Sequence, residues 1–398
     1  MSTTRVPPPE PPGPLDSAGA ADSAAVRLAR AYLLRVAEPP APAVVEFVAQ
    51  HGPVAAAEAI RTGECPSRVR DETEARRKHD QAQRDLDEGE RLGMRLLTPE
   101  DDAWPGWPLL SLELAAARGV PGVAPPLALW VRGRTRLDEA TEQAVAIVGS
   151  RAASDYGDHV AGELAYSLAG RGVPIISGAA YGVDGAAHRG ALAAGGTTVA
   201  LLGCGLDAGY PAGHLVLLDK IAELGGLVVS EYPPGTPPAR HRFLVRNRLI
   251  AALSEGTVVV EAGRRSGARN TATTARALGK VVMAVPGSIA SAMSVGCHEL
   301  IRDAGAALVA SVEDVIETVG RLGTPRPEKV RAKRPTDGLG PDALRVHEAL
   351  HKREGKSAEQ IATESGVPVA RVRALLPALE LDELAERCDS GWRGRTRR

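Results

Sequence analysis

Paired cysteines, aromatic side chains and long hydrophobic runs are all scarce in this chain of 398 residues. Its four cysteines, Cys65, Cys204, Cys297 and Cys388, are far apart and form no C-x-x-C pair, which argues against a zinc ribbon. With no apolar signal segment evident, disulfides are not expected either. No apolar run reaches the roughly 18 residues that a membrane span requires. These absences predict a soluble cytoplasmic protein with no metal or cofactor.

A surplus of one charge sign is absent too, because 48 Lys and Arg oppose 49 Asp and Glu. A uniformly basic surface for nucleic acid is therefore excluded, whereas a local basic groove is not, since net charge does not report its distribution. Only 7 of the 48 basic residues are Lys. This bias fits either a GC-rich genome or a need for guanidinium groups, which bind phosphate in a fork geometry.

The composition, 44% hydrophobic and 24% charged, is that of a globular protein, and the length favours two or three domains. Proline is frequent in the first 14 residues, which indicates a disordered tail. Helical patterns follow, and after them an α/β pattern, a basic proline-containing linker and a short helical segment ending in a hairpin. The predicted boundaries are a tail at 1–23, a small helical (SAM-like) domain at 24–93, a Rossmann-like domain at 94–322, a linker at 323–340 and a winged-helix-like domain at 341–398.

The central region contains short runs rich in Val and Ile that alternate with helical stretches and are bounded by Gly or Pro. Continuous apolar strands that alternate with helices are typical of a parallel sheet covered on both faces. The sequence therefore predicts a doubly wound, Rossmann-like parallel sheet. Its expected strands are 144–148, 173–176, 198–202, 227–230, 257–260, 281–285 and 307–309.

Glycine-rich turns follow several of these strands, at the sheet edge where open α/β sheets bind ligands. Gly149, Ser150 and Arg151 follow the first, and Ser177, Gly178 and Gly182 accompany the second. Such turns can present backbone N–H groups to an anion, although an ordinary βα turn is about equally compatible with the first of them. Ser266 and Gly267 begin a later helix in the same way.

The most informative stretch places four Arg within nine residues around one of only two Phe residues in the chain. Charged groups can follow phosphates while an aromatic ring stacks on a base, as in single-stranded nucleic-acid binding. The alternative is a helix with a core Phe and solvated Arg side chains. The candidate residues are Arg240, Phe243, Arg246, Asn247 and Arg248.

Residues that could support catalysis have plainer interpretations. Asp184, at the start of a helix, is expected to cap the backbone, and His188 is more consistent with a packed histidine than with a base. Cys204 lies between glycines without a histidine to activate it, so a structural thiol is favoured.

In combination, these elements resemble the DNA-processing protein A (DprA, or Smf) family over roughly residues 95–395. The resemblance depends on ordered motifs at 146–151, 177–184, 203–207, 230–233, 243–253, 260–262, 266–267 and 285–287. It implies a non-enzymatic protein that binds single-stranded DNA, loads the recombinase RecA during natural transformation, and acts as a homodimer. It also implies phosphate contacts at the turn 149–151, a base held by Arg240 and Phe243, and an interface that includes His298, Leu300, Ile301 and Leu308.

Two alternatives involve other classes of function. A LOG-type phosphoribohydrolase would use Glu261 as its acid and Arg248 to hold phosphate, but the Pro-Gly-Gly-x-Gly-Thr-x-x-Glu signature of that family is missing. The C-terminal domain could instead read duplex DNA through Arg371 and Arg373. The acidic residues just beyond favour an accessory or protein-binding role.

Overall fold

A computed structural model describes residues 14–320, 336 and 338–395 of the chain. It divides into two compact units, residues 1–324 and 325–398. Most of the predicted linker, and residues 1–13 of the predicted tail, lie outside the described residues. Within the described residues, no helix has the length and apolar character needed to cross a membrane.

The first unit is built on one nine-stranded sheet with the order β1-β2-β6-β5-β4-β3-β7-β8-β9. All seven strands predicted between residues 144 and 309 are present, and the α/β fold is confirmed. The strands are β1 (Met94–Leu97), β2 (Leu129–Arg132), β3 (Val145–Val148), β4 (Ile175–Ser177), β5 (Thr198–Leu202), β6 (Leu227–Ser230), β7 (Gly256–Val259), β8 (Val281–Ala284) and β9 (Ala307–Leu308).

The sheet is mostly parallel rather than wholly so. β1 pairs with β2, and β2 with β6, in antiparallel register, while β3 to β9 pair in parallel. The chain proceeds outward from β3 to β6 and then returns to place β7 on the other side of β3. Parallel neighbours that diverge in this way leave a crevice at their carboxyl ends, which is the topological switch point of the fold.

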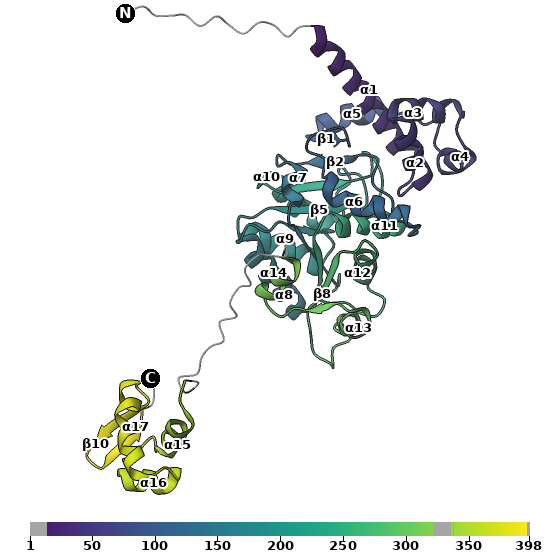
Figure 1. Ribbon diagram of the computed structural model, residues 1–398. Coiled ribbons are helices and arrows are strands. Elements are labelled where there is room, and N and C mark those ends of the chain that lie inside the picture. Colours follow the sequence, from purple (N-terminus) through teal and green to yellow (C-terminus); the bar gives the residue numbers. More distant parts are fainter. Residues whose placement is uncertain (1–13, 321–335, 337, 396–398) are drawn as a thin grey trace, which may run out of the picture. The chain divides into compact units, whose positions relative to one another are not determined.

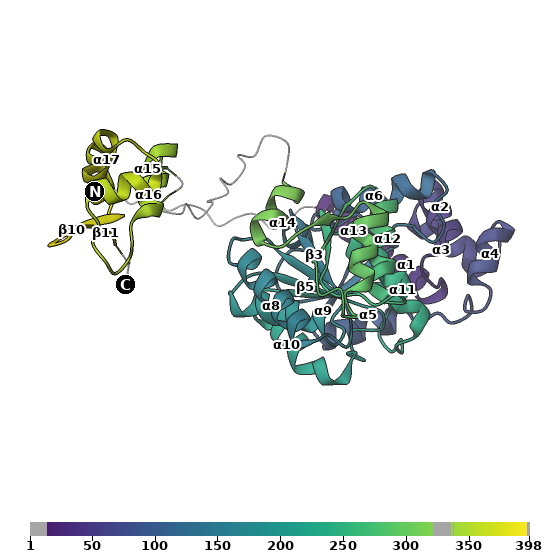
Figure 2. The same ribbon diagram turned by 90° about the horizontal axis from the view of Figure 1, so that it is seen from below.

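Helices cover both faces of the sheet because successive strand residues point to opposite sides. On β3, Ala146 and Val148 belong to one buried cluster and Val145 and Ile147 to another. One face is covered by α6 (Gly106–Ala117), α7 (Leu137–Thr141), α11 (Arg240–Ala252), α12 (Gly267–Ala277) and α13 (Val295–Ala304). The other carries α8 (Asp155–Ala169), α9 (Val183–Ala193), α10 (Leu215–Glu223) after the short helix η1 (Ala212–His214), and α14 (Val312–Val319) (Figure 2).

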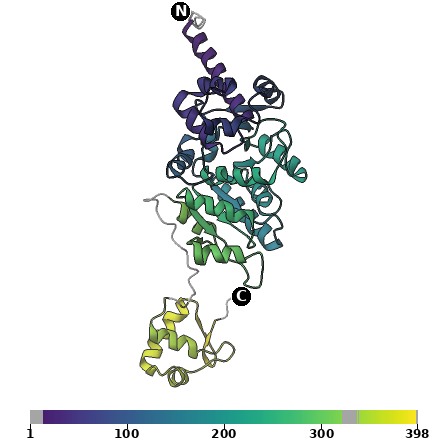
Figure 3. The same ribbon diagram turned by 90° about the vertical axis from the view of Figure 1, so that its right-hand side faces the viewer.

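The N-terminal helices share a hydrophobic core with the β1–β2 end of this sheet (Figures 1 and 3). Tyr32 and Leu33 lie in the same buried cluster as Trp130 and Leu202, so residues 24–93 are not a separate compact unit. The first helix also begins at Pro14, inside the predicted tail, in an Ala-rich stretch of high helix propensity. The helices are α1 (Pro14–Val36), α2 (Pro42–His51), α3 (Pro53–Thr62), α4 (Ser67–Thr73) and α5 (Ala82–Arg91).

The second unit has the predicted winged-helix outline of three helices and a hairpin. Ser357 caps the second helix in a reciprocal capping box with Gln360, and Gly366 ends it in a left-handed conformation. The elements are α15 (Pro341–Ala349), α16 (Ala358–Ser365), α17 (Val369–Leu381), β10 (Ala385–Cys388) and β11 (Gly391–Gly394).

Candidate nucleic-acid interface

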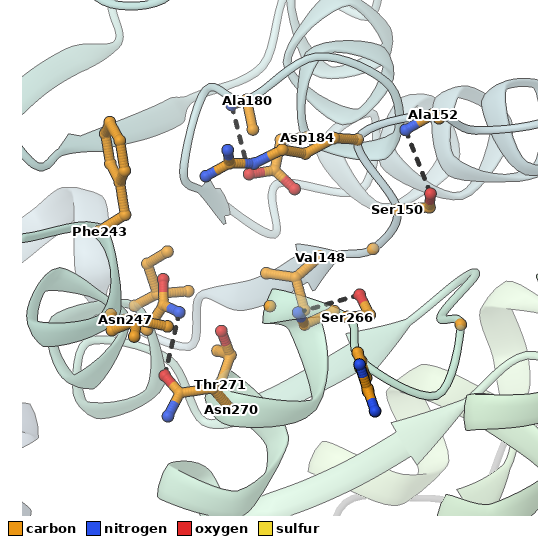
Figure 4. A pocket seen from close by; sticks show the side chains of 18 of the residues that line it. Val148, Ser150, Ala152, Ala180, Asp184, Phe243, Asn247, Ser266, Asn270 and Thr271 are labelled. Atoms are coloured by element: carbon orange, nitrogen blue, oxygen red, sulfur yellow. Dashed lines mark hydrogen bonds between the residues drawn. The ribbon is translucent and has the colours of Figure 1, made fainter. Parts of the chain in front are cut away.

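A cavity of about 600 Å³ lies at the carboxyl ends of β3 and β7, where the strand order diverges. It is called the switch-point cavity below, and Figure 4 shows its walls. Nine of the thirteen predicted DNA-binding residues line it: Gly149, Ser150, Arg151, Arg240, Phe243, Arg246, Asn247, Ser266 and Gly267. Segments that are more than 100 residues apart in the sequence therefore meet at this crevice.

The turn after β3 forms one wall of the cavity. A Cβ on Gly149 would lie 2.6 Å from the side chain of Val183, so only glycine lets α9 pack this closely. The Ser150 hydroxyl is buried and accepts a hydrogen bond of 3.1 Å from the Ala152 backbone N–H. Arg151 is exposed, and its guanidinium carbon lies 5.2 Å from the centre of the Phe243 ring.

The predicted residues at and after the end of β4 pack against neighbouring segments and do not line the cavity. Ser177 is buried and donates to the Ile147 carbonyl at 2.6 Å. Gly182 has a φ of +72°, and a Cβ there would lie 2.4 Å from the Ser150 carbonyl oxygen. A Cβ on Gly178 would lie 2.6 Å from the Arg246 guanidinium. These glycines allow close packing rather than direct access to a ligand.

Helix α11 presents one face to the cavity, because residues spaced by three and four positions align along a helix. Arg240, Phe243 and Asn247 lie on this face. Arg248 does not: it is only 2% exposed and forms a 2.7 Å ion pair with the buried Glu231. The predicted DNA contact by Arg248 does not fit this position, since the helical turn directs the side chain into the protein.

Arg246 is buried where it lines the cavity, and its guanidinium bridges the carboxyl ends of β4 and β5. It donates to the Gly178 carbonyl at 2.8 Å and to the Leu201 carbonyl. Burial lowers its pKa to about 10, although neighbouring Asp184 favours the charged form. Asp184 accepts from the backbone N–H groups of Gly178 and Ala180, and burial raises its pKa. Both side chains hold the loop after β4.

The Phe243 ring is partly buried and has an aromatic neighbour that the sequence did not single out as a site residue. Tyr210, from the loop after β5, stacks on it with ring centres 5.1 Å apart and an interplanar angle of 28°. Tyr210 is 38% exposed. A Cβ on Gly203 would lie 2.8 Å from the Phe243 ring, so that glycine lets the ring approach β5. Aromatic residues are scarce in this chain, so a tyrosine in a loop after a strand of the sheet was the signal that could have identified Tyr210.

The start of α12 forms another wall of the switch-point cavity (Figure 4). The Ser266 hydroxyl accepts from Ala268 N–H as the helix cap, and Asn247 donates to Asn270 at 3.1 Å across the cavity wall. Arg265 is exposed beside them. Arg265 and Asn270 are lining residues that sequence reasoning missed, because nothing local distinguishes them from an ordinary loop and helix start.

Sequence profiles place the chain in a family. The profile described as DNA recombination-mediator protein A matches residues 95–320, which is more than half of the chain. The chain belongs to this family. A second profile, the DprA winged helix domain, matches residues 330–391. Both matches agree with the resemblance inferred from the motifs.

Individual relatives agree with the DprA assignment. DNA processing protein DprA of Mycobacterium tuberculosis is 49% identical over 363 residues, covering 91% of this chain and 93% of that protein. Protein Smf of Escherichia coli is 42% identical over 207 residues, covering 52% of this chain and 53% of Smf. The X-ray structure of DprA from Streptococcus pneumoniae superposes with a TM-score of 0.57 at 31% identity, covering 72% of this chain and 95% of that one.

The residues considered for catalysis in this DprA-family chain are all buried. His188 is fully buried and bonded to Thr198, and burial lowers its pKa to about 3. Burial raises the pKa of the Cys204 thiol to about 11, which disfavours the nucleophilic thiolate. Glu261 is buried and accepts from the Ser154 backbone and hydroxyl at 2.9 and 2.6 Å. A phosphoribohydrolase would need Glu261 and Arg248 to act together. Here Glu261 is bonded to Ser154 and Arg248 is paired with Glu231.

The four predicted interface residues differ in accessibility. Leu300 is buried in the core of the α/β unit, which leaves little of its side chain accessible to a partner. His298 is partly buried, with Nε2 3.1 Å from the Gly287 carbonyl, and Ile301 packs against the core. Leu308, on edge strand β9, is 53% exposed.

In the DprA winged helix domain, the two arginines considered for duplex reading are already paired. Arg373 forms an ion pair with Glu359, and Arg371 lies 3.6 Å from Asp342. These pairs reduce the positive charge that α17 would present to a phosphate backbone.

Proposed function

We propose that this chain binds single-stranded DNA in the switch-point cavity without chemically altering it. The observation that carries the proposal is the Phe243 ring beside exposed arginines in an open cavity at the topological switch point. An aromatic ring can stack on any unpaired base, while guanidinium groups follow the phosphates. In duplex DNA the bases are already stacked on one another, so the ring has no free base face to contact.

The charge distribution around the cavity supports an anionic ligand. Arg151, Arg240 and Arg265 are exposed and line it, so positive charge is concentrated here although the whole chain has a formal net charge of −1. The lining carboxylate, Asp184, is buried and already accepts backbone N–H groups. A phosphate backbone would therefore meet guanidinium groups before it meets a carboxylate.

We further propose that the bound strand is passed to the RecA recombinase and that the protein acts as a homodimer in recombination or natural transformation. Support comes from the family description, which names a DNA recombination mediator. Such a mediator must release its strand to a recombinase, which fits a salt-sensitive electrostatic interface better than a deeply enclosed one. Leu308 is exposed on β9, the edge strand of the described sheet, and this supports self-association.

The test compares labelled single- and double-stranded oligonucleotides of equal length and composition by fluorescence anisotropy. The expected result is at least tenfold tighter binding of the single strand. Equal affinities, or tighter binding of the duplex, would contradict the proposal. RecA filament assembly on the same strand, with and without this protein, tests the transfer step separately.

A further inference from the structure

A second cavity, of about 340 Å³, lies at the opposite edge of the sheet from the switch-point cavity. Gln143 and Glu255 line it, and they precede β3 and β7 at the amino ends of those strands. Its remaining walls come from residues 104–108, which span the end of the loop before α6 and the first turn of that helix, and from α7 and the residue after it. DNA bound at the carboxyl edge would leave this surface free.

Four of the residues that line this cavity are apolar, and we name it the Trp–Pro groove after them: Trp104, Pro105, Trp107 and Pro108. It contains two of the four tryptophans in a chain that is only 3% aromatic. Trp104 packs against the hydrophobic core, whereas Trp107 is 79% exposed. An indole ring that is this accessible leaves an apolar face in water, and tryptophan is enriched at protein interfaces, where such a face can pack against a partner.

The carboxylates that line the groove, called its acidic rim below, are those of Asp138, Glu139, Glu142 and Glu255, and no Lys or Arg from the described part of the chain lines it. Arg136 pairs with Asp138 at 2.8 Å and with Glu139 at 3.6 Å, and Lys280 lies 3.9 Å from Glu255. Glu142 forms no ion pair with another residue in the described part of the chain. The rim therefore carries uncompensated negative charge beside an exposed indole.

The walls of the groove are fixed to one another by hydrogen bonds. Arg136 donates to the Asp102 carbonyl at 2.7 Å, and the Asp138 backbone N–H donates to the Ala103 carbonyl at 3.2 Å. The loop before α6 is thereby joined to the start of α7. A ligand would meet a surface that is already formed, so binding would cost little ordering of the groove.

We propose that the Trp–Pro groove binds an arginine- or lysine-bearing segment of a partner protein. A cation placed over an indole face is attracted by the ring, most strongly by tryptophan, and carboxylates can bind its N–H groups in the same position. Nucleic acid is disfavoured as the occupant, because its phosphates would face the acidic rim. The two sheet edges would thus bind opposite charges, DNA at one and a basic protein segment at the other.

The test uses a fluorescein-labelled peptide with three arginines spaced by Gly-Ser, and the same peptide with uncharged citrulline in place of arginine. Anisotropy titrations with the full chain are expected to detect the arginine peptide and at least fivefold weaker binding of the citrulline peptide. Trp107→Ala is expected to weaken arginine-peptide binding at least fivefold, and Glu142→Gln about twofold. Because Trp107 is mostly exposed, unchanged thermal melting should verify that the variant is folded.

Glu113→Gln is the matched control, since it removes an exposed charge from α6 outside the groove. It should leave peptide affinity unchanged. The proposal is overturned if the arginine peptide does not bind, if citrulline binds equally well, or if folded Trp107→Ala binds like the wild type. An equal loss in Glu113→Gln would also overturn it, because only diffuse surface charge would then be involved.

Discussion

At the scale of single residues, a substitution of Phe243 can show whether its ring stacks on a base or is a core side chain. The ring is partly exposed, with Tyr210 against it and Arg151 nearby. Phe243→Ala should therefore cost about 1–3 kcal/mol of single-strand affinity. It should change folding stability by less than the about 3–5 kcal/mol typical of a buried Phe. Oligothymidylate titrations and thermal melts of the same preparations measure both quantities.

Phe243→Trp is the conservative comparison, and it should retain much of the affinity because its ring also offers a face for stacking. Arg240→Ala combined with Phe243→Ala should show a partly non-additive loss if both side chains hold one nucleotide. A strongly destabilised Phe243→Ala whose folded fraction binds DNA normally would assign the ring to the core instead.

Arg151 tests the electrostatic part of the interface. If about six phosphates are neutralised, the slope of log affinity against log salt for a single strand should be near −4. Arg151→Ala removes one contact, so affinity should fall across all sequences and the slope should become shallower by about 0.7. Arg134→Ala, which removes an exposed charge outside the cavity, is the control. Identical salt dependence in the two variants would argue against a phosphate contact at Arg151.

The residue scale also shows where sequence reasoning reached its limit. Gly149 and Ser150 after β3 could be assigned to a turn because their local order and position predict it. The sequence could not show that Arg248 is buried while Arg240 is exposed, because both lie in one basic stretch. Their different environments follow from helix rotation against the sheet, which buries Arg248 with Glu231 and exposes Arg240.

At the scale of elements, α11 connects the switch-point cavity to the N-terminal helices. Its cavity face carries Phe243, and its other side meets Glu38, which follows α1. Glu38 accepts from Arg242 at 2.7 Å and from Arg76 at 2.5 Å, and its Oε1 lies 3.2 Å from His241 Nε2. A carboxylate between three basic side chains thus connects the residues after α1 to α11, the helix that carries Phe243.

Glu38→Gln should consequently lower both folding stability, by about 1–2 kcal/mol, and single-strand affinity at neutral pH. Partial burial raises the pKa of Glu38, but hydrogen bonds from Arg242 and Arg76 outweigh it and lower the pKa from 4.5 to about 2. Because the folded-state pKa is depressed, this stabilisation is complete above pH 4.5 and is lost as the pH falls toward 2.

Thermal melts of wild type and Glu38→Gln across this pH range measure the effect, and their difference should shrink on acidification. Glu58→Gln, an exposed glutamate on α3 paired only with Arg61 among the described residues, provides the control. A stability difference that is independent of pH would show that the charge of Glu38 is not what holds α11.

The α/β elements themselves were predictable because buried parallel strands are short apolar runs with turn residues at both ends. The antiparallel pairing of β1 and β2 was not predictable. The relative direction of two strands depends on which strand of the sheet each one pairs with, and the local sequence does not show that. The many charged residues between 71 and 92 likewise do not form one continuous helix, because the chain leaves helical conformation between α4 and α5. There the Tyr32 hydroxyl donates to the Arg77 carbonyl at 2.8 Å, a partner 45 residues away.

At the scale of the whole molecule, edge strand β9 is the surface on which we expect two copies to meet. Leu308 is exposed there, and in a two-fold interface one substitution introduces two charges. Leu308→Arg should convert dimers to monomers in analytical ultracentrifugation without loss of folding. Leu224→Arg, at another exposed leucine, should remain dimeric. A monomeric wild type, or an intact Leu308→Arg dimer, would reject this interface.

The sequence by itself determined the α/β class, the strand positions, the glycine turns and the winged-helix outline, because each depends on the order of nearby residues. Tertiary structure decided which side chains share a site. Tyr210 stacks on Phe243, Glu38 reaches α11, and Trp104 and Trp107 join Glu255 in one groove. These neighbours are separated by tens to hundreds of residues, so their proximity follows from sheet order and helix packing and not from any local pattern.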